Sequence, residues 1–396
     1  MEALTSTLDA LLDRVVAGPL RAPGVAALAT DRNGVLYEGA AGLRRIDGDA
    51  PFTPDTVCAI YSTTKAVAAT AALQLVEEGR LDLDAPAKRY LPEIGELQVL
   101  DGFDAAGAPR LRPPKRDVTT RMLLLHTSGF GYPTFNAAYL RLVREHGRPD
   151  VATATRAAFR LPLLFDPGEG WEYGVGLDWA GMVVEAIAGA RLGAVLAERV
   201  FAPCGMTSTA FTPTSQMLTR RASLHQRRAD GSLKPLDVAP LADPEVHMGG
   251  GGLYGTATDY IRFIRMWLND GMGDAGRVLR PETVAMAARN GLGDRRIGAL
   301  PAVIPALTRE AEFFPGLPKS WGLSFMINDA PAPTGRPAGA LAWAGLANLY
   351  YWIDRENGVG GFWATQILPF FDPTSLQGFL DFETAVYRAM AKPGAA

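Results

Sequence analysis

The spacing of apolar positions predicts a helix at each end of the chain. In the first stretch, apolar residues recur at the period of one helix face, at Leu4, Leu8, Leu11 and Val15. Acidic residues lie between these positions and no basic segment precedes them, so we interpret the stretch as an amphipathic helix and not as a signal peptide. The run from Leu376 to Ala391 predicts the closing helix.

Strand patterns lie next to both predicted helices. Two short apolar runs between Gly24 and Gly39 flank Asn33-Gly34, a strong hairpin signal. Four β-rich runs fill the last third of the chain, at Trp321 to Ile327, Leu341 to Ala347, Tyr350 to Ile353 and Phe362 to Leu368. Asp354 to Gly361 predicts a hairpin turn between the last two runs.

The middle of the chain favours helix. Helix-former runs separated by Pro and Gly cover Ala137 to His146, Val151 to Phe159 and Leu177 to Ala190, and Thr258 is a candidate cap for a helix through Leu268. The turn-rich segment from Leu100 to Thr119 is interpreted as a long connection. The pattern predicts an α+β fold: one antiparallel sheet from both chain ends, flanked by the terminal helices, with an inserted mainly helical lobe. Residues 1–396 would form one catalytic domain, with its site between the two lobes.

Composition narrows the possible partners. The 396 residues are 48% hydrophobic and 20% charged with a formal net charge of −3, and no Lys/Arg cluster suggests nucleic-acid binding. Cys58 and Cys204 are expected to be buried thiols. The four histidines are scattered without metal-ligand spacing, so neither a metal nor another cofactor is expected. No apolar run is as long as a membrane span, and the expectation is a soluble cytoplasmic protein without a membrane partner.

The candidate chemistry lies in Ile60 to Gly79, IYSTTKAVAATAALQLVEEG. The composition predicts a helix with Ser62 at or just inside its N-terminus, and Lys65 follows one turn later on the same face. A hydroxyl and an amine held this way can share a proton, which is typical of a Ser-x-x-Lys nucleophile. An ordinary helix cap is the alternative, although Lys65 alone among six lysines has a Ser three residues before it.

Two further segments could complete such a site. Tyr173 follows a Pro-Gly turn and precedes a predicted helix, and a nearby Lys65 ammonium would lower the pKa of its phenol. The Leu341 to Asn348 strand could present the backbone N–H of Leu346 as an oxyanion donor beside that of Ser62. The alternatives are a half-buried structural Tyr and a small-residue strand packed closely on a helix.

These motifs together resemble family VIII carboxylesterases, which share a fold with class C β-lactamases and D-alanyl-D-alanine peptidases. The motifs are Ser62-Thr63-Thr64-Lys65, Tyr173 and Trp343-Ala344-Gly345, with LDLDAPAKRYLPE, LLLHTSGFGY and GGGGLYGTATDY. The stretch before HTSG, with YGVGLDWAG, is also similar to the fungal acyltransferases that attach the lovastatin side chain. The resemblance implies that Ser62 is the nucleophile, Lys65 and Tyr173 handle protons, and Trp343 to Leu346, including Gly345, form the oxyanion strand. It also implies that Tyr132 lines the acyl pocket.

Two positions depart from the β-lactamase pattern. Val175 stands where β-lactamases carry the Asn of Tyr-x-Asn, and Trp343 stands where they carry the Lys of Lys-Thr-Gly. The second change removes the cation that would bind a β-lactam carboxylate. We therefore expect neutral esters to fit better than anionic β-lactams.

The sequence thus predicts a serine carboxylesterase that cleaves small-molecule esters with short or medium acyl groups through a Ser62 acyl-enzyme. An acyltransferase that passes the acyl group to an alcohol is the first alternative. A non-catalytic relative that only binds peptidoglycan or another ligand is the second, and it would be expected to have lost Ser62, Lys65 or Tyr173. All three residues are present.

Overall fold

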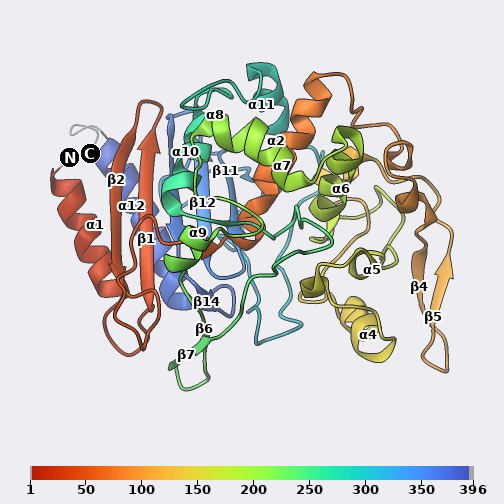
Figure 1. Cartoon of the computed structure of the whole chain (residues 1–396), viewed down its shortest axis with the longest axis horizontal. Helices are drawn as coiled ribbons and strands as arrows, with labels where there is room; N and C mark the ends of the chain where they lie inside the picture. The colour runs from red at the N-terminus through yellow and green to blue at the C-terminus, as the bar shows by residue number, and fades with distance from the viewer. Residues whose placement is uncertain (1, 392–396) are drawn as a thin grey trace.

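The computed structural model describes residues 2–391 and contains a seven-stranded sheet in the order β2-β1-β13-β12-β11-β10-β9 (Figure 1). Each pair of neighbouring strands is antiparallel. The strands are β1 (Gly24–Asp31), β2 (Val35–Gly42), β9 (Lys319–Trp321), β10 (Met326–Asn328), β11 (Leu341–Gly345), β12 (Leu349–Asp354) and β13 (Val359–Ala364). The N-terminal hairpin therefore pairs with the C-terminal strands, and this confirms the predicted α+β sheet.

Helices cover both faces of this sheet. The terminal helices α1 (Glu2–Val15) and α12 (Pro373–Met390) pack on each other at one face, and α10 (Ala257–Leu268) packs on β1, β12 and β13 at the other (Figure 1). Residues along β11, β12 and β13 are buried throughout, which explains why these strands are continuous apolar runs. The apolar face predicted for the first helix is buried in α1, at Leu4, Leu8, Leu11 and Val15.

The helical lobe is built around α2 (Thr64–Glu77), which packs against α6 (Gly176–Ala188). Every residue of α2 from Thr64 to Leu75 is buried, and its alanines allow this close approach on all sides. The other helices in this part of the chain are α3 (Thr120–Leu124), α4 (Ala137–Glu145), α5 (Arg156–Phe159), α7 (Leu192–Leu196) and α8 (Ala202–Cys204). The structure thus confirms the inserted helical lobe (Figure 1).

Short elements complete the chain. The remaining helices are α9 (Ser215–Thr219) and α11 (Pro281–Ala287), with the 3₁₀ turns η1 (Tyr61–Thr63), η2 (Ala87–Arg89), η3 (Pro92–Glu96) and η4 (Val151–Thr153) and the π-helical η5 (Ala197–Phe201). The smaller strands are β3 (Cys58–Ala59), β4 (Val99–Phe103), β5 (Pro109–Arg112), β6 (Leu224–Arg227), β7 (Leu233–Leu236), β8 (Tyr254–Gly255) and β14 (Ile367–Leu368).

Two predicted elements are each divided in the structure. The strand predicted from Phe362 to Leu368 is β13, which ends at Ala364, and β14, which pairs with β6 in a separate sheet. The helix predicted from Val151 to Phe159 is the 3₁₀ turn η4 and the short helix α5, because Ala154 between them has a left-handed backbone with φ of 49°.

Three other local predictions are wrong. The supposed connection after Leu100 contains the β4–β5 hairpin, whose turn is stabilised by the Asp104 carboxylate accepting from two backbone N–H groups. The predicted strand from Trp321 to Ile327 is two strands, β9 and β10, because the chain reverses between them through Ser324 with φ of 83°. The cap of α10 is Thr256 and not Thr258, since the Thr256 hydroxyl accepts from the Asp259 N–H.

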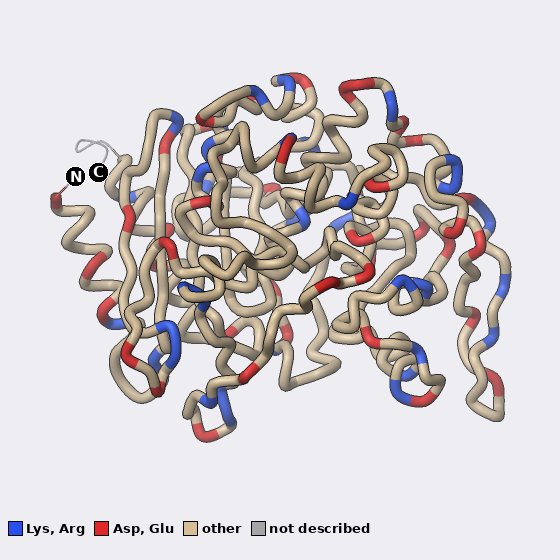
Figure 2. Tube along the Cα trace, in the orientation of Figure 1, with Lys and Arg blue, Asp and Glu red and all other residues tan. Residues whose placement is uncertain are grey.

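Lys/Arg and Asp/Glu are interspersed over the outer loops (Figure 2). Within residues 2–391, no single helix has the length and apolar character to cross a membrane, and one pair bent by 81°, Gly176–Ala188 with Leu192–Cys204, meets that test by length and composition. Cys58 and Cys204 are free and buried, as predicted.

Candidate active site

Ser62 and Lys65 lie where the chain enters α2. Ser62 is in the 3₁₀ turn η1, directly before the helix, and Lys65 is in the first helical turn. The Lys65 Nζ donates to Ser62 Oγ at 3.1 Å. The predicted pairing of hydroxyl and amine is therefore present in the structure.

Lys65 is completely buried, and its surroundings set its protonation. Its Nζ also donates to the Tyr132 hydroxyl at 3.1 Å and to the Gly250 carbonyl at 2.6 Å. Burial disfavours the charged amine and lowers the pKa of Lys65 to about 7, although the Asp178 carboxylate opposes this shift. A large fraction of neutral amine is therefore available near pH 7.

Asp178 is a component of the site that the sequence analysis missed. Its carboxylate accepts from the Tyr132 hydroxyl at 3.2 Å and from the Gly250 N–H at 2.9 Å, and burial raises its pKa. Tyr132 thus does more than line the pocket, because it joins Asp178 to Lys65. The sequence does contain a signal for this residue. Asp178 is the acidic residue in the otherwise apolar first turn of α6, and a carboxylate buried there requires hydrogen-bond partners.

Gly250 explains why a glycine run stands beside this cluster. A Cβ at Gly250 would collide with the Asp178 carboxylate and lie 2.7 Å from the Tyr132 hydroxyl oxygen. Gly250 to Gly252 line the cleft.

Tyr173 approaches Ser62 from the other side, just before α6. Its hydroxyl accepts from Trp343 Nε1 at 2.9 Å. The Ser62 side chain is near enough to lower the pKa of the Tyr173 phenol. The Lys65 Nζ lies 4.7 Å from the centroid of the Tyr173 ring. The structure therefore brings the predicted Ser, Lys and Tyr together.

The protonation predicted for Tyr173 is wrong. We expected Lys65 to lower the pKa of its phenol, but the pKa is raised. Burial is the main cause, and the Ser62 side chain and the hydrogen bond from Trp343 oppose it only in part. Tyr173 is a neutral phenol in the resting site.

His126 holds the backbone on both sides of Tyr173. Its carbonyl accepts from the Glu172 N–H at 3.0 Å, its Nδ1 accepts from the Gly174 N–H at 3.4 Å, and the centroids of the His126 and Tyr173 rings are 4.8 Å apart. Both backbone partners lie far along the chain from His126. Burial keeps the pKa of His126 well below its usual value.

The end of β11 lies directly beside the Ser62 turn. A Cβ at Gly345 would lie 2.6 Å from the Ile60 carbonyl oxygen, so this close approach requires glycine. Trp343, Gly345 and Leu346 line the same cleft as Ser62. The position predicted for the oxyanion strand is thus adjacent to the nucleophile.

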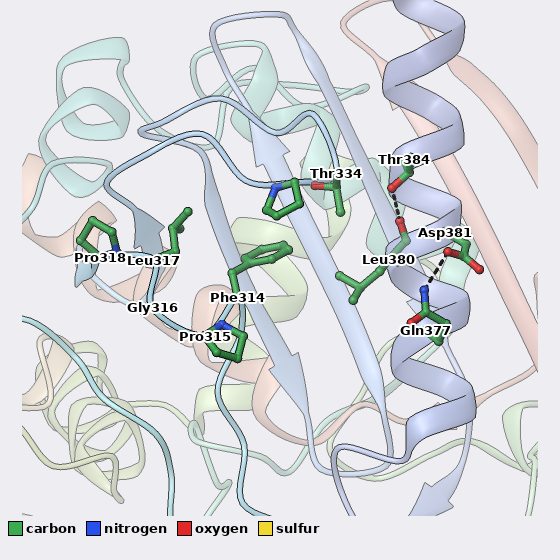
Figure 3. Close-up of a pocket in the computed structure, with 11 residues that line it drawn as sticks. Phe314, Pro315, Gly316, Leu317, Pro318, Thr334, Gln377, Leu380, Asp381 and Thr384 are labelled. Carbon is green, nitrogen blue, oxygen red and sulfur yellow. Dashed lines mark hydrogen bonds between the residues drawn. The ribbon is translucent and has the colours of Figure 1, made fainter.

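The cleft above Ser62 has a volume of about 540 Å³, which lies in the range of sites for drug-sized ligands. Its walls away from Ser62 are mostly apolar and include Phe135, Phe159, Phe211, Leu236, Val238, Leu241, Leu300, Leu307 and Phe370. A separate hollow lies between the Phe314–Pro318 segment and α12 (Figure 3). The residues that line that hollow do not include Ser62, Lys65, Tyr132, Tyr173 or Asp178.

An antiparallel sheet covered by terminal helices, with a Ser-x-x-Lys helix at the edge of a helical lobe, defines the serine β-lactamase-like class of proteins. Residues 12–383 match the family described as Beta-lactamase, and the chain belongs to that family.

Curated relatives and a solved structure extend this finding. The chain is 34% identical over 383 residues to the monacolin J acid methylbutanoyltransferase of Aspergillus terreus, covering 92% of this chain and 91% of that protein. It is 32% identical over 370 residues to the lovastatin esterase of Penicillium rubens, covering 87% and 89%. The LovD6 mutant of the Aspergillus terreus simvastatin synthase has a TM-score of 0.85 at 30% identity, covering 98% and 95%. The predicted fold and the similarity to lovastatin acyltransferases are confirmed.

Proposed function

We propose that this chain is a serine carboxylesterase that hydrolyses esters with short or medium acyl groups through an acyl-enzyme on Ser62. One observation carries the proposal: the Ser62 hydroxyl lies between a buried amine of lowered pKa and a buried phenol. An amine that is partly neutral near pH 7 can accept a proton from a hydroxyl that it contacts.

Acylation begins when the neutral Lys65 amine takes the Ser62 proton and Ser62 Oγ attacks the ester carbonyl. The backbone N–H groups of Ser62 and Leu346 would stabilise the oxyanion. Tyr173 then donates its proton to the leaving alkoxide and becomes a phenolate. The Lys65 ammonium and the Trp343 indole N–H, both beside the Tyr173 side chain, stabilise that phenolate.

Deacylation reverses these proton transfers. The Tyr173 phenolate takes a proton from water, and the resulting hydroxide attacks the acyl carbonyl. When the tetrahedral intermediate collapses, Ser62 Oγ leaves and recovers its proton from Lys65. The acid product departs, and the neutral amine and neutral phenol of the resting site are restored.

Acyl transfer to an alcohol is the second candidate, and two observations favour it. The cleft is mostly apolar, which lets an organic alcohol compete with water for the acyl-enzyme. The relatives include proteins named as an acyltransferase and as an esterase. Adding an alcohol such as 1-butanol to the ester assay separates the outcomes, because a transferase forms a new butyl ester faster than it releases acid.

We also propose that the chain works in the cytoplasm as one two-lobed catalytic domain of the family VIII type. Both lobes contribute to the site, since Tyr173 precedes α6 in the helical lobe and Trp343 belongs to the sheet. Two buried free thiols suit a reducing compartment.

The direct test is Ser62→Ala with p-nitrophenyl butyrate as substrate. We expect hydrolysis to fall to the background rate while the circular dichroism spectrum is retained. Ser6→Ala, a change at an exposed position of α1, is the matched control and should keep full activity. An undiminished rate in Ser62→Ala would overturn the proposed mechanism.

A further inference from the structure

The charges on the walls of the cleft have one sign. Among the described residues that line it, the charged side chains are Asp150 and Asp178, and both are carboxylates. Lys65 lies below this surface, completely buried, with its donors directed to Ser62, Tyr132 and Gly250. A ligand in the cleft therefore meets acidic and apolar groups.

The two carboxylates lie at different places in the cleft. Asp178 lies beside the Lys65 cluster and is satisfied by Tyr132 and Gly250. Asp150 belongs to another segment, where it caps η4 by accepting from the Ala152 N–H at 2.8 Å. Val238 and Leu241 belong to the segment after β7 that also lines the cleft, and they are 51% and 43% exposed. The lining of the cleft thus includes both partly exposed apolar side chains and a carboxylate that is held by a backbone N–H.

Two arginines near this segment bind its backbone. Arg221 donates to the Val238 carbonyl at 2.8 Å, and Arg191 donates to the Pro244 carbonyl at 2.6 Å. Arg191 also lies 3.7 Å from the Glu185 carboxylate. Neither guanidinium lines the cavity.

From this arrangement we propose that the cleft selects a bulky, apolar and uncharged alcohol portion and rejects an alcohol that carries a carboxylate. The inference rests on the proposed function and specifies its substrate class. A carboxylate that leaves water for this cleft would gain no cationic partner from the walls and would meet a like charge at Asp150. A neutral ester of the same size gains the apolar contacts without that cost.

The test compares two substrates that differ in one group: the butyrate esters of 7-hydroxycoumarin-4-acetic acid and of its methyl ester. Their leaving phenols have similar acidity, so a difference reports binding of the remote group. We expect kcat/KM for the methyl ester to exceed that for the free acid by about 100-fold or more, chiefly through KM. A ratio within about threefold of one would overturn the inference.

A variant at the cleft wall sharpens this test. Ala152→Arg places a cation next to Asp150, and Ala152 is exposed, so an added side chain can project into solvent. The variant should lower the ester-to-acid ratio by about tenfold, while Ala152→Gln, which adds bulk without charge, should leave the ratio unchanged. Equal ratios in the two variants would overturn the electrostatic origin of the selection.

Failure of this inference is distinguishable from failure of the proposed function. p-Nitrophenyl butyrate is small and neutral and serves as the reference substrate in every assay. If it is hydrolysed while both coumarin esters react equally, the selection against carboxylates is wrong and the Ser62 mechanism stands. If the enzyme hydrolyses none of the three esters, the proposed function itself is contradicted.

Discussion

Trp343 donates its indole N–H to the hydroxyl of Tyr173 at 2.9 Å, across 170 residues of sequence. Both side chains are buried, with exposures of 5% and 4%. The donor lowers the pKa of the phenol, in opposition to burial. Trp343 therefore favours the phenolate that Tyr173 must form when it gives its proton to the leaving alkoxide.

Removing this donor should slow catalysis. Trp343→Phe keeps an aromatic wall but loses the hydrogen bond to a developing charge, which is a loss of about 1.5–3 kcal/mol. We expect kcat for p-nitrophenyl butyrate to fall by about 10- to 100-fold. Trp352→Phe is the matched control, because Trp352 is a buried Trp of the same sheet whose indole N–H has no partner in residues 2–391. Full kcat in Trp343→Phe would show that the indole N–H is dispensable.

The pH dependence of kcat/KM should report Lys65. The pKa of Lys65 is lowered to about 7, and the mechanism requires its neutral form. The rate constant should therefore decrease as pH falls through about 7 and level off above it. Steady-state kinetics from pH 5 to about 9 would measure this acidic limb.

Asp178→Asn provides the control for this assignment. The Asp178 carboxylate raises the pKa of Lys65, so its neutral replacement should move the acidic limb to lower pH. A limb that stays in place, or one that moves to higher pH, would assign the titration to a group other than Lys65.

Gly250 and Gly251 are neighbours in the glycine run, and we expect a substitution by Ala to impair catalysis at the first position and to be tolerated at the second. Gly250→Ala would drive a methyl group into the Asp178 carboxylate, whereas a Cβ at Gly251 has its nearest atom at an ordinary 3.7 Å. We expect Gly250→Ala to reduce kcat by about 100-fold by displacing Lys65 and its partners, and Gly251→Ala to remain within about threefold of wild type. Kinetics of both variants with p-nitrophenyl butyrate, with melting temperatures as the folding control, test this. Similar activities in the two variants would contradict the described packing.

His126 should act as a positioning residue for Tyr173. His126→Ala removes the acceptor for the Gly174 N–H, and its positive φ of 58° also disfavours Ala. We expect kcat to fall about tenfold with KM nearly unchanged, and unfolding free energy to fall by about 2 kcal/mol. His126→Asn suits the backbone conformation and can offer an acceptor, so it should recover part of both losses. Denaturant unfolding combined with kinetics measures the two effects, and a variant that loses stability alone would limit His126 to a structural role.

The sequence was most informative where contacts are local. Ser62 and Lys65 share one turn of chain, so helix propensity and spacing were sufficient to predict their proximity. The sheet could be inferred because apolar runs at both chain ends need a common core. Asp178, by contrast, acquires its importance from Tyr132 and Gly250, which lie in other segments.

The incorrect prediction for the pKa of Tyr173, like the missed role of Asp178, concerns a property that the tertiary fold sets. The sign of its pKa shift depends on how completely the fold excludes water, and sequence spacing does not report that. The split of the Trp321 to Ile327 run likewise depends on Ser324 adopting a left-handed conformation, which its sequence does not signal. Placement of the Ser62 turn beside Gly345 followed from the motif resemblance, and its tight geometry became evident only in three dimensions.

The central claim is that Ser62 carries the acyl group during turnover. The most direct measurement is intact-protein mass spectrometry after mixing the enzyme with p-nitrophenyl butyrate and quenching in acid, followed by peptide mapping. The account predicts a single butyryl adduct on the peptide that contains Ser62, absent from Ser62→Ala and present in Ser6→Ala. A butyryl group on another residue that is retained in Ser62→Ala, together with continued turnover, would contradict it.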